Sequence, residues 1–245
     1  LLAPDLYDNG FKSWVLRYAL PDNPLFIPEV RYGDYSGARA MYVFGEYDCL
    51  GYSPFSIDNP ASSASTNLAA SYQLLHQMMP MILHAQGQKN KKKWGVLLDK
   101  TTKDTTIVDG DIVMKCSHSY TLPWGTHPGE WPEVGAMIIK LAENDYLIAG
   151  SGVVTVFRHQ SELSQSEKRQ LGEDGFALAG SDNHTSANDT RWNGNCIGLG
   201  TVDEVTIGTD GGLNYVRRLN GDQTHQGRHV DLGDWRILHV KLYNY

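Results

Sequence analysis

Apolar residues recur at three- and four-residue spacings in the first third of the chain. Phe11, Trp14, Val15 and Tyr18 form one such stripe, which is typical of an amphipathic helix. The spacing predicts helices over residues 11–19, 36–44 and 65–86. Short apolar runs without a helical period lie between them, at residues 24–29 and 49–58. Such runs are typical of strands buried on both faces. The order helix, strand, helix, strand, helix predicts a parallel α/β architecture over residues 1–86.

The period changes at about Trp94, after which short runs of β-branched and apolar residues alternate with Gly, Asn and Asp. Many short strands with frequent turn signals are typical of an antiparallel sandwich or barrel. The expected strands cover residues 94–99, 105–109, 111–116, 136–141, 145–150, 152–157, 196–207, 213–218 and 235–243. The turn at Gly208–Gly212 would join two of them as a hairpin. We therefore predict a second domain, an antiparallel β-sandwich, over residues 87–245.

Glu29 ends the first apolar run and is the leading candidate for a functional residue. In parallel α/β folds the carboxyl ends of the strands carry the active site, so a carboxylate that terminates a strand is a catalytic candidate. The run alone also fits a structural role, in which Glu29 caps the next helix or pairs with Arg31.

Three segments around Glu29 resemble the last two βα units of a glycoside hydrolase family 35 β-galactosidase. They are Pro24–Glu29, Ala38–Glu46 and Gly51–Asp58. The closing segment, Arg218–Arg228 followed by a strand to Tyr245, is similar to the end of the bacterial branch that carries a C-terminal β-domain. The resemblance implies the closing portion of a (β/α)8 TIM barrel, followed by the antiparallel β-sandwich domain.

The same resemblance implies a retaining hydrolase that acts on terminal β-galactosyl linkages in an oligosaccharide or polysaccharide. Glu29 matches the position of the family nucleophile, and Tyr52 and Phe55 are candidates to line the sugar subsite. The acid/base Glu of the family follows the fourth barrel strand, which has no counterpart here, so we expect it outside this chain. Retaining hydrolysis by two carboxyl groups needs no cofactor and no metal.

Three other carboxylates lie near these segments, namely Glu46, Asp48 and Asp58. They lie in the segment that resembles barrel strand 8 or shortly before it. The acid/base Glu of the family follows strand 4, so these three residues cannot take its role. We expect Glu46, which ends a helix-like run, to form a structural ion pair.

The length of the chain fits part of such an enzyme. A complete barrel needs ~250 residues, whereas only the first 86 of the 245 residues have the α/β pattern. We therefore expect an N-terminal barrel portion outside this chain and no glycosidase activity from this chain alone. Residues 1–5 lack the features of a signal peptide. The alternative is a non-catalytic carbohydrate-binding or interaction module that carries a barrel remnant.

The composition of the chain limits the classes of molecule that it is expected to bind. Hydrophobic residues make up 41% of the chain and the net charge is −7, which argues against nucleic acid as a partner. Nothing approaches the ~20 apolar residues of a membrane span. The single basic run, Lys89–Lys93, is expected to be a solvated linker or loop. The three cysteines are widely spaced and are expected to be buried free thiols. The cysteines do not indicate whether the protein occupies an oxidising or a reducing compartment. We expect a bacterial periplasmic or secreted location.

Polar and aromatic clusters in the second domain mostly favour structural roles. The histidines lack ligand spacing, and the Asn/Asp-rich stretch lacks the calcium-loop pattern with its terminal Glu. These residues are His118, His127, His159, Asp182–His184 and Asn188–Asp189. Three loop tryptophans, Trp124, Trp131 and Trp192, could contact sugar, but packing anchors are more common. We expect the second domain to pack on the helix at residues 65–86 as a structural brace.

Overall fold

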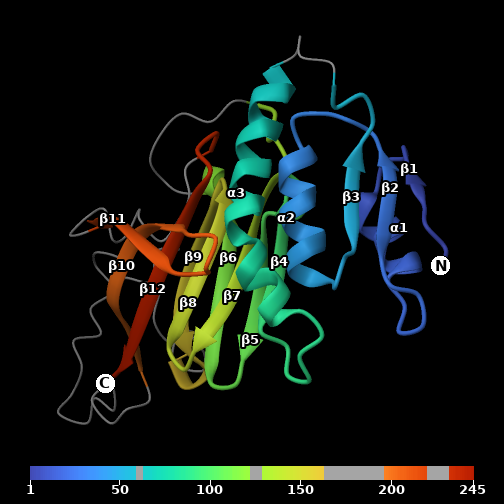
Figure 1. Ribbon diagram of the computed structural model, residues 1–245. Helices are drawn as coiled ribbons and strands as arrows, with labels where there is room; N and C mark the ends of the chain where they lie inside the picture. Colours follow the sequence, from blue (N-terminus) through green and yellow to red (C-terminus); the bar gives the residue numbers. More distant parts are fainter. Residues whose placement is uncertain (59–62, 122–128, 163–195, 220–231) are drawn as a thin grey trace.

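A computed structural model describes residues 1–58, 63–121, 129–162, 196–219 and 232–245. The chain begins with alternating strands and helices (Figure 1). In chain order these are β1 (Asp5–Leu6), α1 (Phe11–Tyr18), β2 (Phe26–Val30), α2 (Ser36–Glu46), β3 (Gly51–Pro54) and α3 (Ser63–Ala85). The strands form one parallel sheet in the order β1-β2-β3. The predicted helices and strands are confirmed, and β1 is an additional strand, too short at two residues to show a pattern.

The remaining described chain is almost entirely antiparallel β-structure. Its elements are β4 (Lys93–Leu98), β5 (Asp104–Asp109), β6 (Ile112–His118), the 3₁₀ turn η1 (Ser119–Thr121), β7 (Val134–Ala142), β8 (Asp145–Ser151), β9 (Val153–His159), β10 (Ile197–Ile207), β11 (Leu213–Leu219) and β12 (Arg236–Asn244). Six strands form one sheet in the order β11-β10-β12-β8-β7-β4, and three form another in the order β5-β6-β9. The Gly208–Gly212 turn joins β10 and β11 as predicted, with the Gly208 N–H donating to the Gly212 carbonyl at 2.9 Å.

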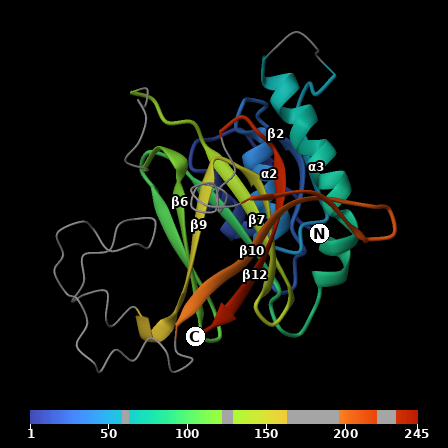
Figure 2. The ribbon, with the colours of Figure 1, turned by 90° about the vertical axis from the view of Figure 1, so that its left-hand side faces the viewer.

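The six-stranded sheet is the central layer of the molecule, and its strands β7 and β8 are buried on both faces. Along β7, Met137 and Ile139 belong to the core shared with the helices, whereas Ala136 and Ile138 belong to the core between the two antiparallel sheets. Figures 1 and 2 show α2 and α3 on one side of this sheet and β6 and β9 on the other. This arrangement is compatible with a β-sandwich that carries helices on its outer face. Burial on both faces explains why these strands read as continuous apolar runs.

Helix α2 contacts the sheet at backbone distance. A Cβ built on Gly95 of β4 would lie 2.1 Å from the carbonyl oxygen of Tyr42, and one on Gly135 of β7 would lie 2.4 Å from that of Ala38. Only residues without a Cβ allow this approach. The expected packing of the β-part on α3 is present, but α2 lies over more of the sheet. The two parts of the chain therefore share one core, with α2 at its centre.

The basic run Lys89–Lys93 is only partly solvated, and the expectation of a linker is wrong for its last residue. Lys93 is 4% exposed and begins β4. Its ammonium group donates to the carbonyls of Phe44 at 3.0 Å and Tyr47 at 2.6 Å, and it pairs with Asp48 at 2.9 Å. These carbonyls lie at the C-terminus of α2, where helical carbonyls have no intrahelical partner and a cation is favourable. Lys93 is therefore a cap for α2.

A buried ion pair also joins α2 to the segment that enters β7. Arg39 donates from Nε to Glu133 Oε2 at 2.8 Å and from Nη2 to Oε1 at 2.7 Å. The guanidinium lies over the ring of Tyr35, with 3.9 Å to the ring centre. Desolvation by itself lowers the pKa of Arg39, but the hydrogen bonds and charge of Glu133 outweigh it and raise the pKa. The bidentate geometry fixes both distance and orientation between the two elements.

Two further expectations are met in the described chain. All three cysteines are buried free thiols. Desolvation raises the pKa of Cys49 to about 11 and that of Cys116 to about 12. None of the helices in the described ranges has the length and apolar content of a membrane span.

We predict that Gly95→Ala destabilises the protein by about 3 kcal/mol or more. The new methyl group would meet backbone atoms of α2 that cannot rotate away, and overpacking of this kind costs ~1–3 kcal/mol even where side chains can adjust. The matched control is Gly129→Ala, where no atom lies within 4 Å of the added methyl group. Urea unfolding of both variants measures the difference, and equal stabilities would contradict the close approach of α2.

We predict that Glu133→Gln lowers the free energy of unfolding by about 1–3 kcal/mol, because the buried Arg39 charge loses its counter-ion. The control is Glu204→Gln, which breaks the pair of Glu204 with Arg217, whose side chain is 47% exposed. An exposed pair contributes less than about 1 kcal/mol. Urea unfolding at neutral pH distinguishes the two, and a control loss as large as that of Glu133→Gln would contradict a special role for the buried pair.

Candidate functional site

Glu29 lies at the carboxyl end of the middle strand of the parallel sheet, as predicted. It is opposite Asp5 in β1, and the pairing of β2 with β3 moves from Ile27 directly to Val30. Pro28 falls in this gap. Proline has no N–H to donate to a neighbouring strand, and irregularities of this kind turn side chains out of the regular alternation. The sequence itself therefore interrupts the ladder immediately before Glu29.

Tyr7, which follows β1, is the direct partner of Glu29. Its hydroxyl donates a hydrogen bond to Glu29 Oε1. This hydrogen bond raises the pKa of Tyr7 to about 12, with smaller contributions from desolvation and the nearby negative charges. The phenol therefore stays a neutral donor at physiological pH. No described residue other than Tyr7 hydrogen-bonds to Glu29, so Oε2 has no partner among the described residues. Neither proposed structural role of Glu29 matches this partner.

Phe55, which follows β3, completes the cluster. Its ring contacts that of Tyr7 edge to face, with the ring centres 6.4 Å apart, and the residue is 54% exposed. Tyr7, Glu29 and Phe55 thus come from the carboxyl ends of β1, β2 and β3 in turn. A partly exposed carboxylate beside two aromatic rings can contact both the hydroxyl groups and the apolar face of a sugar.

Tyr52 lies elsewhere, within the core. It is 6% exposed and packs edge to face on Phe11, with 6.3 Å between the ring centres. Its hydroxyl is buried. This position does not support direct contact between Tyr52 and sugar, and Phe55 is the better placed of the two candidates.

The other carboxylates belong to different parts of the molecule. Glu46 ends α2, where it pairs with Lys91 at 2.5 Å and accepts from the Gly95 N–H at 3.2 Å. The expected structural ion pair of Glu46 is thus confirmed. Asp48 accepts a hydrogen bond from the Gly87 N–H and forms an ion pair with Lys93, the cap residue of α2. Asp58 is exposed in the turn after β3.

Two of the candidate histidines, His118 and His159, contact other groups of the protein. His118 Nε2 lies 3.0 Å from the Pro132 carbonyl, and His118 Nδ1 accepts from the Tyr120 N–H at 3.0 Å. His159 Nδ1 lies 2.7 Å from the Ser161 hydroxyl. No cluster of metal-ligating side chains occurs in the parts that the structure describes.

Trp131 stacks on His118, with 4.9 Å between the ring centres, and Lys103 lies 5.4 Å from the centre of its ring. These contacts fit the packing-anchor interpretation of this loop tryptophan. The remaining candidates lie outside the described residues. They are His127, Trp124, Trp192, Asp182–His184, Asn188–Asp189 and residues 220–228 of the closing segment.

Sequence reasoning missed Tyr7. Its only signal is the alternation around a strand of two residues, Asp5–Leu6, which is too short to define a face. Only the register of β1 on β2 brings Tyr7 to Glu29.

One family model matches the chain. Its description is a domain of unknown function, DUF5597, and it matches residues 68–231, about two thirds of the chain. The match begins within α3 and covers the antiparallel part up to residue 231, so β12 lies after it and Tyr7, Glu29 and Phe55 lie before it. A comparison with curated proteins finds no match.

We predict that the phenol of Tyr7 titrates near pH 12 and that Glu29→Gln moves this titration toward the ordinary value of 10.0. The amide of Gln can still accept from the phenol, but it lacks the negative charge that disfavours tyrosinate. NMR of ¹³C-labelled tyrosine rings measures it, with Tyr7→Phe to assign the signal. Glu46→Gln is the control and should leave this signal unchanged. An unchanged Tyr7 pKa in the Glu29→Gln variant would contradict the hydrogen bond between Tyr7 and Glu29.

Proposed function

Because the chain belongs to the DUF5597 family, which has no assigned function, we propose a function from the cluster around Glu29. We propose that this chain is the C-terminal part of a retaining β-galactosidase. The enzyme hydrolyses terminal β-galactosyl linkages in oligosaccharides or polysaccharides, with Glu29 as the nucleophile. The observation that carries the proposal is the position of Glu29 at the carboxyl end of the middle strand of a parallel β/α array.

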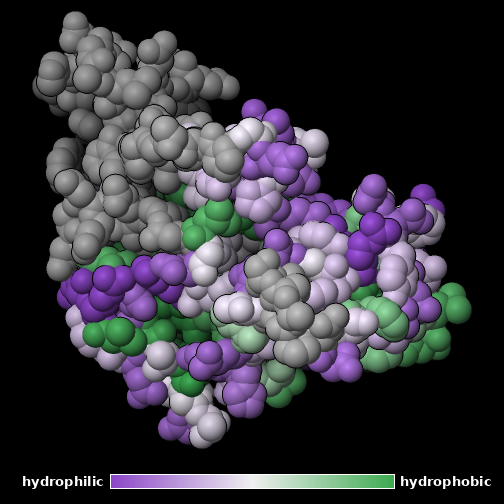
Figure 3. Space-filling model, turned by 90° about the horizontal axis from the view of Figure 1, so that it is seen from above, coloured by the Kyte–Doolittle hydropathy of each residue, from purple (hydrophilic) through white to green (hydrophobic). Residues whose placement is uncertain are grey.

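The architecture supports a barrel origin for this array. Three strands in sequential order, each followed by a helix, have the arrangement of consecutive (β/α)8 units. Apolar side chains are exposed around the parallel sheet, and Figure 3 includes hydrophobic surface on the side of the molecule where this sheet lies. They include Leu1, Leu2, Leu20, Leu50 and Ile57. In the proposal, further βα units of the enzyme cover these side chains and supply the acid/base Glu.

The chemistry follows from two carboxyl groups. Glu29 Oε2 attacks the anomeric carbon while the acid/base Glu protonates the departing glycosidic oxygen, which gives a covalent galactosyl ester. The acid/base, now a carboxylate, then removes a proton from water, and the water oxygen displaces Glu29 from the sugar. Tyr7 holds Oε1 and so orients the attacking oxygen, because a fixed carboxylate loses less freedom on reaching the transition state. Phe55 offers its exposed ring to the galactose.

A second candidate is a non-catalytic carbohydrate-binding module. It is favoured by one observation, namely that the matching family model covers most of the antiparallel part and not Glu29. The two candidates differ in whether Glu29 forms a covalent bond with the sugar.

We predict that Glu29→Gln, in protein expressed together with its upstream coding sequence, lowers the turnover of an aryl β-galactoside by several orders of magnitude. The amide keeps the shape of the side chain but cannot act as the nucleophile. An activated 2-fluoro-galactoside should label Glu29, as peptide mass spectrometry would show. This chain alone should turn over no aryl β-galactoside.

Glu46→Gln is the matched control, because Glu46 is a carboxylate of the same type in a structural ion pair. Its turnover should stay within a few-fold of wild type. Labelling at Glu46 or Asp58 in place of Glu29 would refute the assignment of the nucleophile. Absence of both labelling and turnover in the longer protein would favour the binding module.

A further inference from the structure

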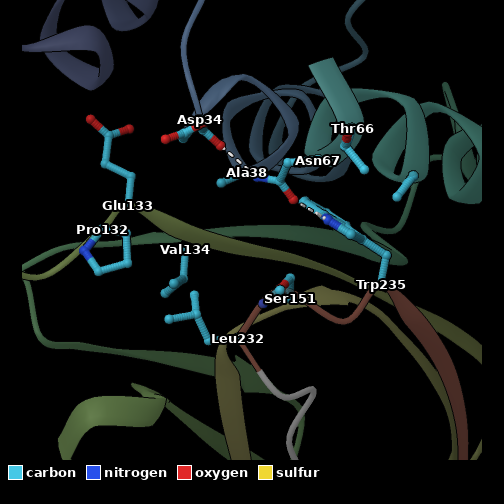
Figure 4. Close-up of a pocket in the computed structure, with 12 residues that line it drawn as sticks. Asp34, Ala38, Thr66, Asn67, Pro132, Glu133, Val134, Ser151, Leu232 and Trp235 are labelled. Atoms are coloured by element: carbon cyan, nitrogen blue, oxygen red, sulfur yellow. Dashed lines mark hydrogen bonds between the residues drawn. The ribbon is translucent and has the colours of Figure 1, made fainter. Parts of the chain in front are cut away.

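A pocket of about 420 Å³ lies where the α/β part meets the six-stranded sheet (Figure 4). Its walls come from the β2–α2 loop, the first turns of α2 and α3, and the ends of β7, β8 and β12 that face them. The polar or aromatic side chains that line it include Asp34, Thr66, Asn67, Glu133 and Trp235. This volume falls in the range of ~300–1,000 Å³ typical of small-molecule sites, which are common where two parts of a protein meet.

Trp235 forms a fixed aromatic wall of the pocket. Its Nε1–H donates to Asn67 Oδ1 at 2.6 Å, and Asn67 Nδ2 in turn donates to the Asp34 carbonyl at 2.7 Å. A Cβ built on Gly37 of α2 would lie 2.8 Å from Trp235 Cη2, so the ring packs against helix backbone. Figure 4 shows this chain of hydrogen bonds along one side of the pocket. The ring is thus held in place before any ligand arrives, which lowers the entropic cost of binding.

The charges around the pocket disfavour an anion. Among the described residues, the pocket lining includes the carboxylates of Asp34 and Glu133 and no lysine or arginine. Glu133 is already neutralised by Arg39, so the negative charge available to a ligand is that of the exposed Asp34. Apolar side chains, among them Val134 and Leu232, form much of the remaining wall. A ligand that suits this lining has an apolar face, several hydroxyl donors and no negative charge.

The pocket shares one end of the α/β part with Glu29. Asp34 lies in the loop between the carboxyl end of β2, which carries Glu29, and the N-terminus of α2. Strand ends and the following helix starts lie at the same edge in a βα unit. A carbohydrate chain that places its terminal sugar at Glu29 has this pocket on the same edge of the molecule.

We propose that this pocket is a second carbohydrate site, which binds neutral pyranose rings of the chain that carries the galactosyl group cleaved at Glu29. The apolar face of one ring packs on Trp235, and its hydroxyl groups donate to the Asp34 carboxylate and exchange hydrogen bonds with Thr66. The part of this inference that concerns the substrate rests on the proposed function. Binding of neutral sugar at the pocket does not.

The test uses the chain as it stands and β-1,4-galactotetraose as the probe, with binding measured by isothermal titration calorimetry. We expect saturable binding that Trp235→Ala weakens at least tenfold, a change of about 1.4 kcal/mol. Thr66→Tyr should also abolish binding, because a ring at this exposed position fills the pocket without touching the core. Ala69→Tyr is the matched control, since Ala69 is exposed on the same helix but does not line the pocket. Melting temperatures confirm that each variant is folded.

Tetragalacturonate is the charge control, since it has similar sugar rings with carboxylates, and it should not bind. Failure of galactotetraose to bind, or equal binding to Thr66→Tyr and wild type, would overturn the proposal. Binding of spermidine in place of galactotetraose, lost in Asp34→Asn, would also overturn it and identify a cation site. Suppose that galactotetraose binds in this pocket but the longer protein hydrolyses an aryl β-galactoside equally well without Glu29. The pocket proposal is then supported, and the proposed function of Glu29 is refuted.

Discussion

The backbone contact between α2 and the six-stranded sheet is the constraint on which the rest of the structure depends. Gly95 and Gly135 let the helix approach until main-chain atoms meet, and no larger residue fits in either place. Two further contacts hold the helix in this position. Arg39 forms an ion pair with Glu133, and Lys93 caps the carbonyls at the end of the helix. Because β2 precedes this helix and β3 follows it, the parallel sheet is positioned by the same contact.

This placement brings residues from the two parts of the chain to one edge of the molecule. The cluster of Tyr7, Glu29 and Phe55 is built from three successive strand ends, so its geometry depends on the register of the parallel sheet. The pocket with Trp235 is built from the same loops and from the ends of antiparallel strands. A ligand that spans both would contact residues far apart in the sequence, and each part of the chain would contribute to its recognition.

Most of the elements could be predicted from the sequence, because their patterns are local. The helices around Phe11 and Ala38 and the strands after Trp94 fall close to the predicted ranges. What the sequence could not reveal is non-local. The hydrogen bond from Tyr7 depends on strand register, and the role of Lys93 depends on which helix end lies above it.

The same limit applies to Tyr52 and Trp235. The resemblance of Gly51–Asp58 to a barrel unit makes Tyr52 a candidate for the site, but its side chain packs against Phe11 in the core. Trp235 was visible only as the start of a strand, and the glycine that accommodates its ring lies almost two hundred residues earlier, at position 37. Patterns within a window of ten or twenty residues cannot hold that information.

The buried cysteines have a consequence for the conditions in which this fold can exist. Thiolate, not thiol, is the species that oxidises and exchanges. With a pKa of about 12, Cys116 is ionised in only about one molecule in 10⁵ at neutral pH. Cys49 and Cys196 are also enclosed by the folded chain. The folded protein therefore has no disulfide among these three cysteines, and burial shields their thiols from oxidants in solution.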